Sequence, residues 1–275
     1  MKIVADSSSN VFTLEGVSFA SVPLKIITAQ AEYMDDEKLD VKAMAEQIKA
    51  TKGRTGTSCP NVHDWLEAFG DADQVFAVTI TSNLSGCCAA AVQAKQVYEE
   101  AHPSAKVHVI DTLSTGPEMR LVVEKLRQWI MEGKSFEEIC HAEQTYRAHT
   151  GLLFSLESLD NFARNGRVNP AVAKVTGVLG IRIVGTASQE GTLQQLHKCR
   201  GEKKALETLV SELRGRGFAG GRACISHSFN APAAEALKKQ ILAIWPGSQV
   251  TVEQNGGLCC YYAEPGGLLL GFESQ

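Results

Sequence analysis

The first half of the chain alternates short, unbroken apolar runs with helical patterns of apolar residues. Residues 2–5, 75–80 and 107–110 are predicted strands without a polar face. Helices are predicted over 41–48 (after Asp40), from near Gly86, over 121–130 and after Ser135, where Ser135 and Glu138 fit a capping box. Strands that lack alternation and are separated by helices are typical of a parallel sheet covered on both faces.

The second half has a different pattern, with successive strands and fewer helices. The predicted strands are 151–156, 181–185, 192–197, 222–227, 249–253 and 257–263, and the predicted helices are 202–214 and 231–244. This order indicates a mixed or antiparallel sheet. We therefore predict two α/β domains, 1–150 and 151–275. No proline-rich or serine-rich linker separates them, so they are expected to pack closely.

The composition of the 275-residue chain limits the class of protein. It is 44% hydrophobic and 21% charged, as expected for a packed globule. A net charge of -4 argues against a nucleic-acid-binding protein. The apolar run at the N-terminus is too short for a signal peptide, and no run approaches the roughly 20 apolar residues of a membrane helix. A cytoplasmic location is predicted, with the eight cysteines reduced and serving as small buried residues.

Hydroxyl groups follow each predicted strand of the first half. They occur at 6–9, at 81–82 and 85–86, and at 111–115, together with the carboxylates of Asp6 and Asp111. In open parallel sheets, ligands bind outside the carboxyl ends of the strands. Hydroxyls in these positions also serve as helix N-caps, so a single serine need not touch a ligand. As a group they favour a site for a carboxylate or small anion, best placed at Ser85 and Gly86, where glycine permits close backbone approach.

Motifs for nucleotide or metal chemistry fail on inspection. Gly133–Lys134–Ser135 lacks the leading glycine of a phosphate-binding loop. Residues 215–220 match GxGxxG, but they follow a helix and precede a strand, which indicates a helix stop instead. His141 and His149 have no partners at metal-ligand spacing. No catalytic residue, metal site or cofactor is predicted.

Six short motifs, taken in order, resemble the DegV family. They are Asp6-Ser7-Ser8, Val22-Pro23-Leu24, Thr57-Ser58-Cys59-Pro60, Thr81-Ser82-Asn83-Leu84-Ser85-Gly86, Arg164-Asn165-Gly166-Arg167 and Glu264-Pro265-Gly266-Gly267. The resemblance covers essentially the whole chain. It implies an α/β/α first domain with a parallel sheet and a second domain with a mixed sheet and helices.

The resemblance also implies a function without catalysis in this chain. DegV-like proteins hold a long-chain fatty acid in a tunnel between the domains and present its carboxylate to a separate kinase subunit, which forms an acyl phosphate. Thr57 and Ser85 would bind the carboxylate, Arg167 would support it, and the loop of Pro265 and Gly266 would close over it. The expected ligand-binding set is Thr57, Ser58, Ser82, Ser85, Gly86, Arg167, Tyr262, Pro265 and Gly266.

The sequence departs from the family pattern at several positions. Tyr262 occupies the place of the usual histidine and Cys87 that of a threonine. Arg182-Ile183 stands for a usual Lys-Pro pair, and Asn165 for a usual glycine. Tyr262 either shortens or redirects the head-group pocket, or it is a neutral change around an unchanged lipid site. Its hydroxyl retains hydrogen-bonding capacity.

Basic residues predominate between positions 161 and 204. Eight basic residues stand against Glu190 and Glu202: Arg164, Arg167, Lys174, Arg182, Lys198, Arg200, Lys203 and Lys204. They form either a solvated face or a surface for docking an acidic kinase subunit and for transient contact with anionic lipid.

Two other functions remain open from the sequence. One is a regulatory or scaffold protein without a ligand, because Tyr262 and Cys87 depart from the family pattern. The other is a small-molecule enzyme related to dihydroxyacetone kinase, with Asp6 or Asp111 as a base. Acyl length and saturation, the identity of the partner and the oligomeric state do not follow from the sequence.

Overall fold

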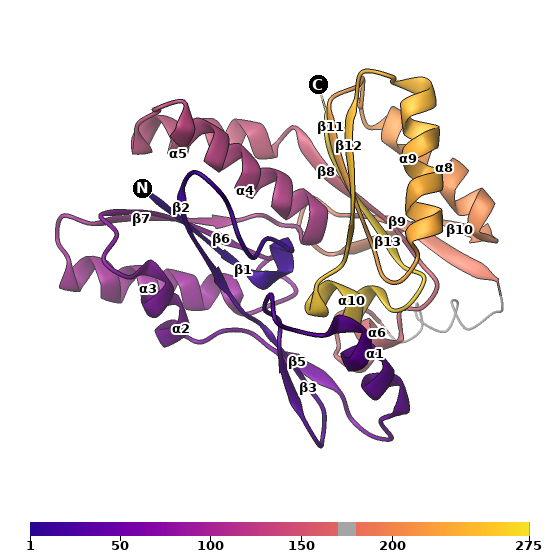
Figure 1. The fold of residues 1–275 in the computed structure, drawn as a ribbon, viewed down its shortest axis with the longest axis horizontal. Coiled ribbons are helices and arrows are strands. Elements are labelled where there is room, and N and C mark those ends of the chain that lie inside the picture. The colour runs from indigo at the N-terminus through magenta and orange to yellow at the C-terminus, as the bar shows by residue number, and fades with distance from the viewer. Residues whose placement is uncertain (170–179, 275) are drawn as a thin grey trace.

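The structure, a computed structural model, describes residues 1–169 and 180–274 (Figure 1). Its first sheet is entirely parallel, in the order β2-β1-β6-β7. The strands are β1 (Lys2–Asp6), β2 (Ser18–Val22), β6 (Gln74–Thr79) and β7 (Lys106–Asp111). The short apolar runs therefore form a parallel sheet, as predicted.

Helices cover both faces of this sheet. Helices α4 (Gly116–Met131) and α5 (Phe136–Arg147) lie on one face, and α2 (Val62–Phe69) and α3 (Cys87–Ala101) lie on the other (Figure 1). Phe76 stacks on Phe136 beneath α5, with ring centroids 4.7 Å apart. The predicted capping box at the start of α5 is confirmed, because Ser135 and Glu138 cap one another.

A small antiparallel sheet, in the order β4-β3-β5, was not predicted. Its strands are β4 (Glu32–Met34), β3 (Lys25–Ile27) and β5 (Gly56–Ser58). Each has three residues, too few to show a period. Helix α1 (Val41–Ala50) follows β4, and Asp40 caps it through Ala43 N at 2.9 Å, as predicted.

The second half forms a mixed sheet in the order β10-β9-β8-β13-β11-β12. Its strands are β8 (Thr150–Leu156), β9 (Ile181–Ala187), β10 (Leu193–Arg200), β11 (Arg222–His227), β12 (Gln249–Gln254) and β13 (Leu268–Glu273). Only β11 and β12 pair in parallel. Helices α8 (Glu202–Gly215) and α9 (Ala231–Ile244) pack on one face, as predicted, and the short α6 (Asp160–Arg164) follows β8.

The predicted strand at 257–263 is wrong. These residues form helix α10 (Gly257–Ala263), and the last strand is β13. Almost every residue of α10 is buried, so the segment lacks the polar face that reveals a helix in sequence. Its N-terminus is held by distant residues: Asp35 accepts from Gly257 N and Asn10 accepts from Gly256 N. These long-range contacts leave no local signal.

The face of the mixed sheet opposite α8 and α9 packs against the first half. A β-carbon built on Gly271 in β13 would lie 2.4 Å from the backbone carbon of Pro117 in α4, so only glycine allows this approach. The ion pairs of Glu124 with Arg222 and of Arg120 with Glu253 join the halves nearby. The close packing agrees with the expectation from sequence, whereas the division into two domains at residue 150 stays a prediction. Among the described residues, no helix combines the length and the apolar character needed to cross a membrane.

Candidate functional site

A largely apolar cavity of about 280 Å³ lies between the two halves, close to the lower end of the range typical of ligand pockets, roughly 300 Å³. The first half contributes the loops after β6 and β7 and the end of β5. The second half contributes the inner face of β8, β9, β10 and β13 together with α6 and α10. The apolar wall consists of Leu24, Ile80, Leu84, Leu152, Phe154, Leu156, Phe162, Ala187, Leu193, Leu258, Ala263 and Leu269. A wall of this composition suits an aliphatic ligand.

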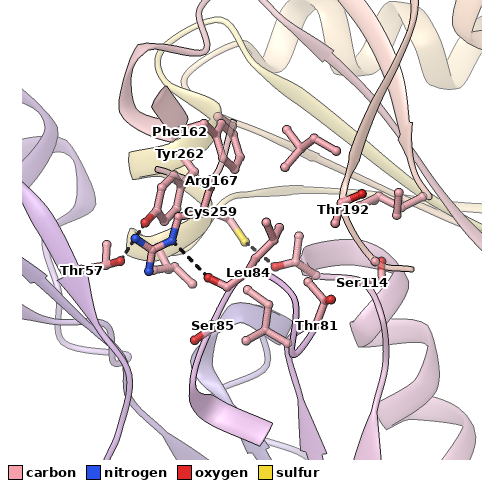
Figure 2. Close-up of a pocket in the computed structure, with 18 of the residues that line it drawn as sticks. Thr57, Thr81, Leu84, Ser85, Ser114, Phe162, Arg167, Thr192, Cys259 and Tyr262 are labelled. Atoms are coloured by element: carbon pink, nitrogen blue, oxygen red, sulfur yellow. Dashed lines mark hydrogen bonds between the residues drawn. The ribbon is translucent and has the colours of Figure 1, made fainter. Parts of the chain in front are cut away.

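Hydroxyl groups from the strand ends line the first-half side of the cavity. Thr81, Ser85, Ser114 and Thr115 all face it, together with the backbone at Gly86. The strands end here because each runs in the same direction in the sheet. In Figure 2, Thr57 lies at one side of the cavity, Ser114 and Thr192 lie at the opposite side, and Thr81 and Ser85 lie along the first-half wall. The expected hydroxyl-lined crevice is therefore present.

The two carboxylates predicted for this crevice do not line it. Asp6 is fully buried, and its carboxylate accepts from Ser8 and from Ile80 N. Burial raises the pKa of Asp6 to about 6. Asp111 accepts from Ser82 N and Leu113 N. Both side chains fix the loops that carry the hydroxyls, and neither contacts the cavity as a base would.

Ser85 lines the cavity but does not cap α3, because the N-cap is Gly86 and no side chain among the described residues caps this helix. It lines the cavity just before α3, and its Oγ accepts a long hydrogen bond from Cys87 N at 3.4 Å. Its hydroxyl also points to Cys87 Sγ at 3.2 Å, a weak acceptor. Because the bond to sulfur is weak, the Ser85 hydroxyl can turn away from Cys87 and donate its proton to a ligand carboxylate instead.

Thr57 and Tyr262 form the centre of one polar end of the cavity. The Thr57 Oγ1 and the Tyr262 hydroxyl are 2.8 Å apart (Figure 2). The Tyr262 ring packs on Phe162, with centroids 4.7 Å apart, and burial raises the pKa of its phenol. Tyr262 therefore stays protonated at neutral pH and bonds Thr57 across the boundary between the two halves.

Arg167 carries the positive charge at this end of the cavity. Its Nε donates to Leu84 O at 3.2 Å (Figure 2). Its Nη1 donates to Asn165 O. These contacts tie the segment after α6 to the loop before α3. Across residues 1–169 and 180–274, no carboxylate pairs with Arg167, and no other charged side chain lines the cavity. The guanidinium is thus available to an anionic ligand.

The structure brings most of the expected ligand-binding residues together. Thr57, Ser58, Ser85, Gly86, Arg167 and Tyr262 line the cavity. Ser82, Pro265 and Gly266 do not line it. Ser82 is exposed, and its amide bonds Asp111. Gly266 instead accepts from Arg182 and Asn230, so in this structure its loop is tied to the second half.

Several lining residues were not found from the sequence. Thr192 and Gly191 lie in the turn between β9 and β10, and Cys259 lies on α10. Asn83 Nδ2 donates to Glu190 O at 2.6 Å, which holds this turn on the first half. No local sequence motif predicts that these residues line the cavity, because they reach it through packing between segments that are distant in sequence.

The cysteines depart in part from their predicted role. Cys87, Cys199, Cys224, Cys259 and Cys260 are buried as expected, but Cys59 is exposed and lines the cavity. Its sulfur lies 3.1 Å from where a β-carbon on Gly86 would stand. All eight are free thiols. Within the described ranges, no group of histidine, cysteine and acidic side chains has the arrangement of a metal site.

The predicted basic surface needs one correction. Arg182 is buried and forms ion pairs with Glu157 and Glu202, so it does not belong to an open basic face. The sequence could not show this, because the two carboxylates come from other elements. Lys174 lies outside the described residues. The exposed members are Arg164, Lys198, Arg200, Lys203 and Lys204.

Fold and cavity together define a two-lobed α/β protein with a mainly apolar cavity between its halves and the positive charge of Arg167 at one end of that cavity. Comparison with known proteins identifies the class: the profile of the DegV family, described as uncharacterised proteins, matches residues 1–274. The chain is 42% identical to a DegV domain-containing protein of Streptococcus pneumoniae over 99% of this chain and 98% of that one. The chain belongs to the DegV family.

Two solved structures resemble this one along their whole length. A DegV family protein from Eubacterium eligens, loaded with heptadecanoic acid, shares 46% identity and a TM-score of 0.98, covering 100% of this chain and 99% of that one. The Streptococcus pneumoniae Fatty Acid Kinase (Fak) B3 protein, loaded with linoleic acid, shares 42% identity, the same TM-score and the same coverage. The predicted family and fold class are thereby confirmed.

Proposed function

We propose that this protein binds one long-chain fatty acid in the cavity between its halves and presents the carboxylate to a separate kinase subunit for formation of an acyl phosphate. The observation that carries the proposal is an apolar cavity whose polar end combines Thr57, Ser85 and the guanidinium of Arg167, which has no carboxylate partner among the described residues. The fatty acids bound by the Eubacterium and Streptococcus relatives support it.

The chemistry of the cavity divides the work between tail and head group. Each buried methylene contributes about 0.8 kcal/mol, so the acyl chain supplies most of the affinity. Neutral hydrogen bonds contribute about 1 kcal/mol each, and they fix the orientation of the carboxylate. No base faces the cavity from the described residues, since Asp6 and Asp111 are engaged in the loops. We therefore assign the phosphoryl-transfer chemistry to the partner.

The cavity itself disfavours the alternative of a ligand-free scaffold. That function predicts a filled or collapsed site, whereas Phe162 and Tyr262 leave the space beside Arg167 open. Tyr262 is accommodated by stacking on Phe162, which keeps its ring from closing the cavity.

Native mass spectrometry of protein purified from bacteria tests the proposal. We expect a single added mass that matches a C16 or C18 fatty acid and is released on denaturation and organic extraction. Addition of a fatty acid kinase subunit and ATP should then convert the bound acid to acyl phosphate. Protein that remains ligand-free after incubation with fatty acids would contradict the carrier function. Formation of acyl phosphate by this chain alone would contradict the assignment of phosphoryl transfer to a separate kinase subunit.

A further inference from the structure

In the hydrogen bond between Thr57 and Tyr262, the positions of the oxygen atoms do not fix which hydroxyl is the donor. Each hydroxyl is able to donate across the 2.8 Å separation. If Thr57 donated to the phenol, its proton would be withheld from any ligand in the cavity. If the phenol donates, the Thr57 proton is free, and its oxygen is already polarised by the bond that it accepts.

Contacts around the neighbouring Tyr261 hold the Tyr262 ring in the orientation in which its hydroxyl meets Thr57. The neighbouring Tyr261 hydroxyl lies 2.8 Å from Thr55 Oγ1 and accepts from Asn165 Nδ2 at 2.9 Å. Two successive tyrosines of α10 thus bond two threonines that are two residues apart, one just before β5 and one within it. Tyr262 also packs edge-to-face on Tyr261, with centroids 5.0 Å apart. The phenol therefore reaches Thr57 with little rotational freedom.

We propose that Tyr262 is a positioning residue for the fatty-acid head group: its hydroxyl donates to Thr57 Oγ1, so that Thr57 donates to the ligand carboxylate. The inference rests on the proposed function, because the carboxylate is the acceptor that selects this direction. A carboxylate is a stronger acceptor than a phenol oxygen, and hydrogen bonds in a chain reinforce one another.

This relay differs chemically from one built on histidine. Burial raises the pKa of the Tyr262 phenol, so its proton stays in place through the neutral range and below. A histidine in this position would change charge near its ordinary pKa of about 6.5. Head-group orientation is therefore insensitive to pH between about 6 and 8, since the ligand carboxyl group is ionised there and the Tyr262 phenol is protonated.

The test uses fatty acid labelled with ¹³C at the carboxyl carbon and bound to the full-length protein. For the wild type we expect one narrow carboxyl resonance that does not move between about pH 6 and 8, a range in which the carboxyl group is ionised. Tyr262→Phe keeps the ring and removes the hydroxyl. It should lower affinity by about three- to tenfold, the effect of one hydrogen bond, and it should shift and broaden the resonance.

A double-mutant cycle separates positioning from loosening of the fold. In a Thr57→Val background, Tyr262→Phe should have no further effect on the resonance, because it acts through Thr57. Tyr261→Phe is the matched control: it removes the neighbouring hydroxyl, which does not line the cavity, and should leave the resonance unchanged. Tyr262→His should make the resonance titrate near pH 6.5, the ordinary histidine pKa.

Three outcomes would overturn the relay. They are additive effects of Tyr262→Phe and Thr57→Val, equal effects of Tyr261→Phe and Tyr262→Phe, and a carboxyl resonance that ignores Tyr262→Phe. Absence of any bound labelled acid in the wild type would instead contradict the proposed function itself, so the two failures are distinguishable.

Discussion

Gly191, in the turn between β9 and β10, lies so close to Thr81 that a β-carbon on the glycine would meet Thr81 Oγ1 at 2.2 Å. The same β-carbon would lie 2.9 Å from the backbone of Leu113. Thr81 and Leu113 belong to the loops after β6 and β7, so this turn of the second half closes directly over the strand ends of the first. The closure seals the cavity on the side opposite Thr57, near Ser114 and Thr192 (Figure 2).

Gly191→Ala should open this closure. The methyl group meets Thr81 and Leu113, and the backbone φ of +74° adds strain for any L side chain. We expect a lower melting temperature and faster release of bound fatty acid to a competing acceptor. Gly201→Ala is the matched control, because its φ is +82° and nothing lies within 4 Å of the added carbon. It should cost about 1–3 kcal/mol of stability and leave release unchanged; equal release rates for both variants would show that closure here does not retain the ligand.

Ser85→Ala should weaken fatty-acid binding only modestly. The substitution removes one neutral donor at the head group, a loss of about 1 kcal/mol or about fivefold in the dissociation constant, while the tail contacts persist. Orientation of the carboxylate should suffer more, measured as slower acyl-phosphate formation with a kinase subunit. Ser82→Ala, in the same loop but outside the cavity, provides the control. A loss of binding beyond a hundredfold would mean that the head group dominates affinity.

The sequence predicted the regular elements well wherever their signal was local. The apolar runs of β1, β6 and β7, the cap at Asp40 and the capping box at Ser135 depend on neighbouring residues, and they were found. Helix α10 was assigned as a strand, because almost all of it is buried and its N-terminus is held by Asp35 and Asn10, residues far away in sequence. The buried state of Arg182 was missed for the same reason.

The candidate site was predicted in its chemistry more than in its shape. The hydroxyls after the strands follow from the direction of a parallel sheet, and the family motifs added Arg167 and Thr57. The turn of Gly191 and Thr192 reaches the cavity only through packing of one half on the other, which no periodicity encodes. Ser82 shows the limit of a motif, since its neighbours Thr81 and Ser85 face the cavity and it does not.

Asp35→Ala should loosen α10 and thereby the polar end of the cavity. The buried Asp35 carboxylate accepts from Gly257 N at 2.6 Å and Leu258 N at 3.2 Å, and α10 carries Tyr262 and Cys259. Two buried amides would lose their acceptor, at about 1–3 kcal/mol each. We expect faster hydrogen exchange at these amides and weaker retention of fatty acid. Asp36→Ala serves as control, because Asp36 accepts from Lys38 N within its own turn; unchanged exchange in Asp35→Ala would show that α10 is held by other contacts.

Asp6 should make the protein more stable as the pH falls from about 6 to about 4. Burial raises its pKa from 3.8 to about 6, so the folded state holds the proton in a range where the unfolded state has lost it. The stabilising contribution of Asp6 to the free energy of unfolding is complete below about pH 4. It is lost as the pH rises through about 6, by at most about 1.4 kcal/mol per pH unit. Urea denaturation of wild type and Asp6→Asn at several pH values measures it. The difference in unfolding free energy between them should change across this range; a constant difference would mean that Asp6 is ionised throughout.

Charge reversal on the exposed basic surface should impair kinase coupling without affecting lipid binding. Lys203 and Lys204 lie in the first turn of α8 and are exposed, and Lys198 and Arg200 lie near them at the end of β10. An acidic partner would be steered to these charges, and such steering is screened by salt. Lys203→Glu with Lys204→Glu should slow acyl-phosphate formation most at low ionic strength and leave the bound fatty acid in place. Lys134→Glu is the control, because it makes the same lysine-to-glutamate charge reversal between α4 and α5, on the other half of the molecule. Equal rates for the reversed and control variants at low salt would assign these lysines to a solvated face and place kinase docking elsewhere on the molecule.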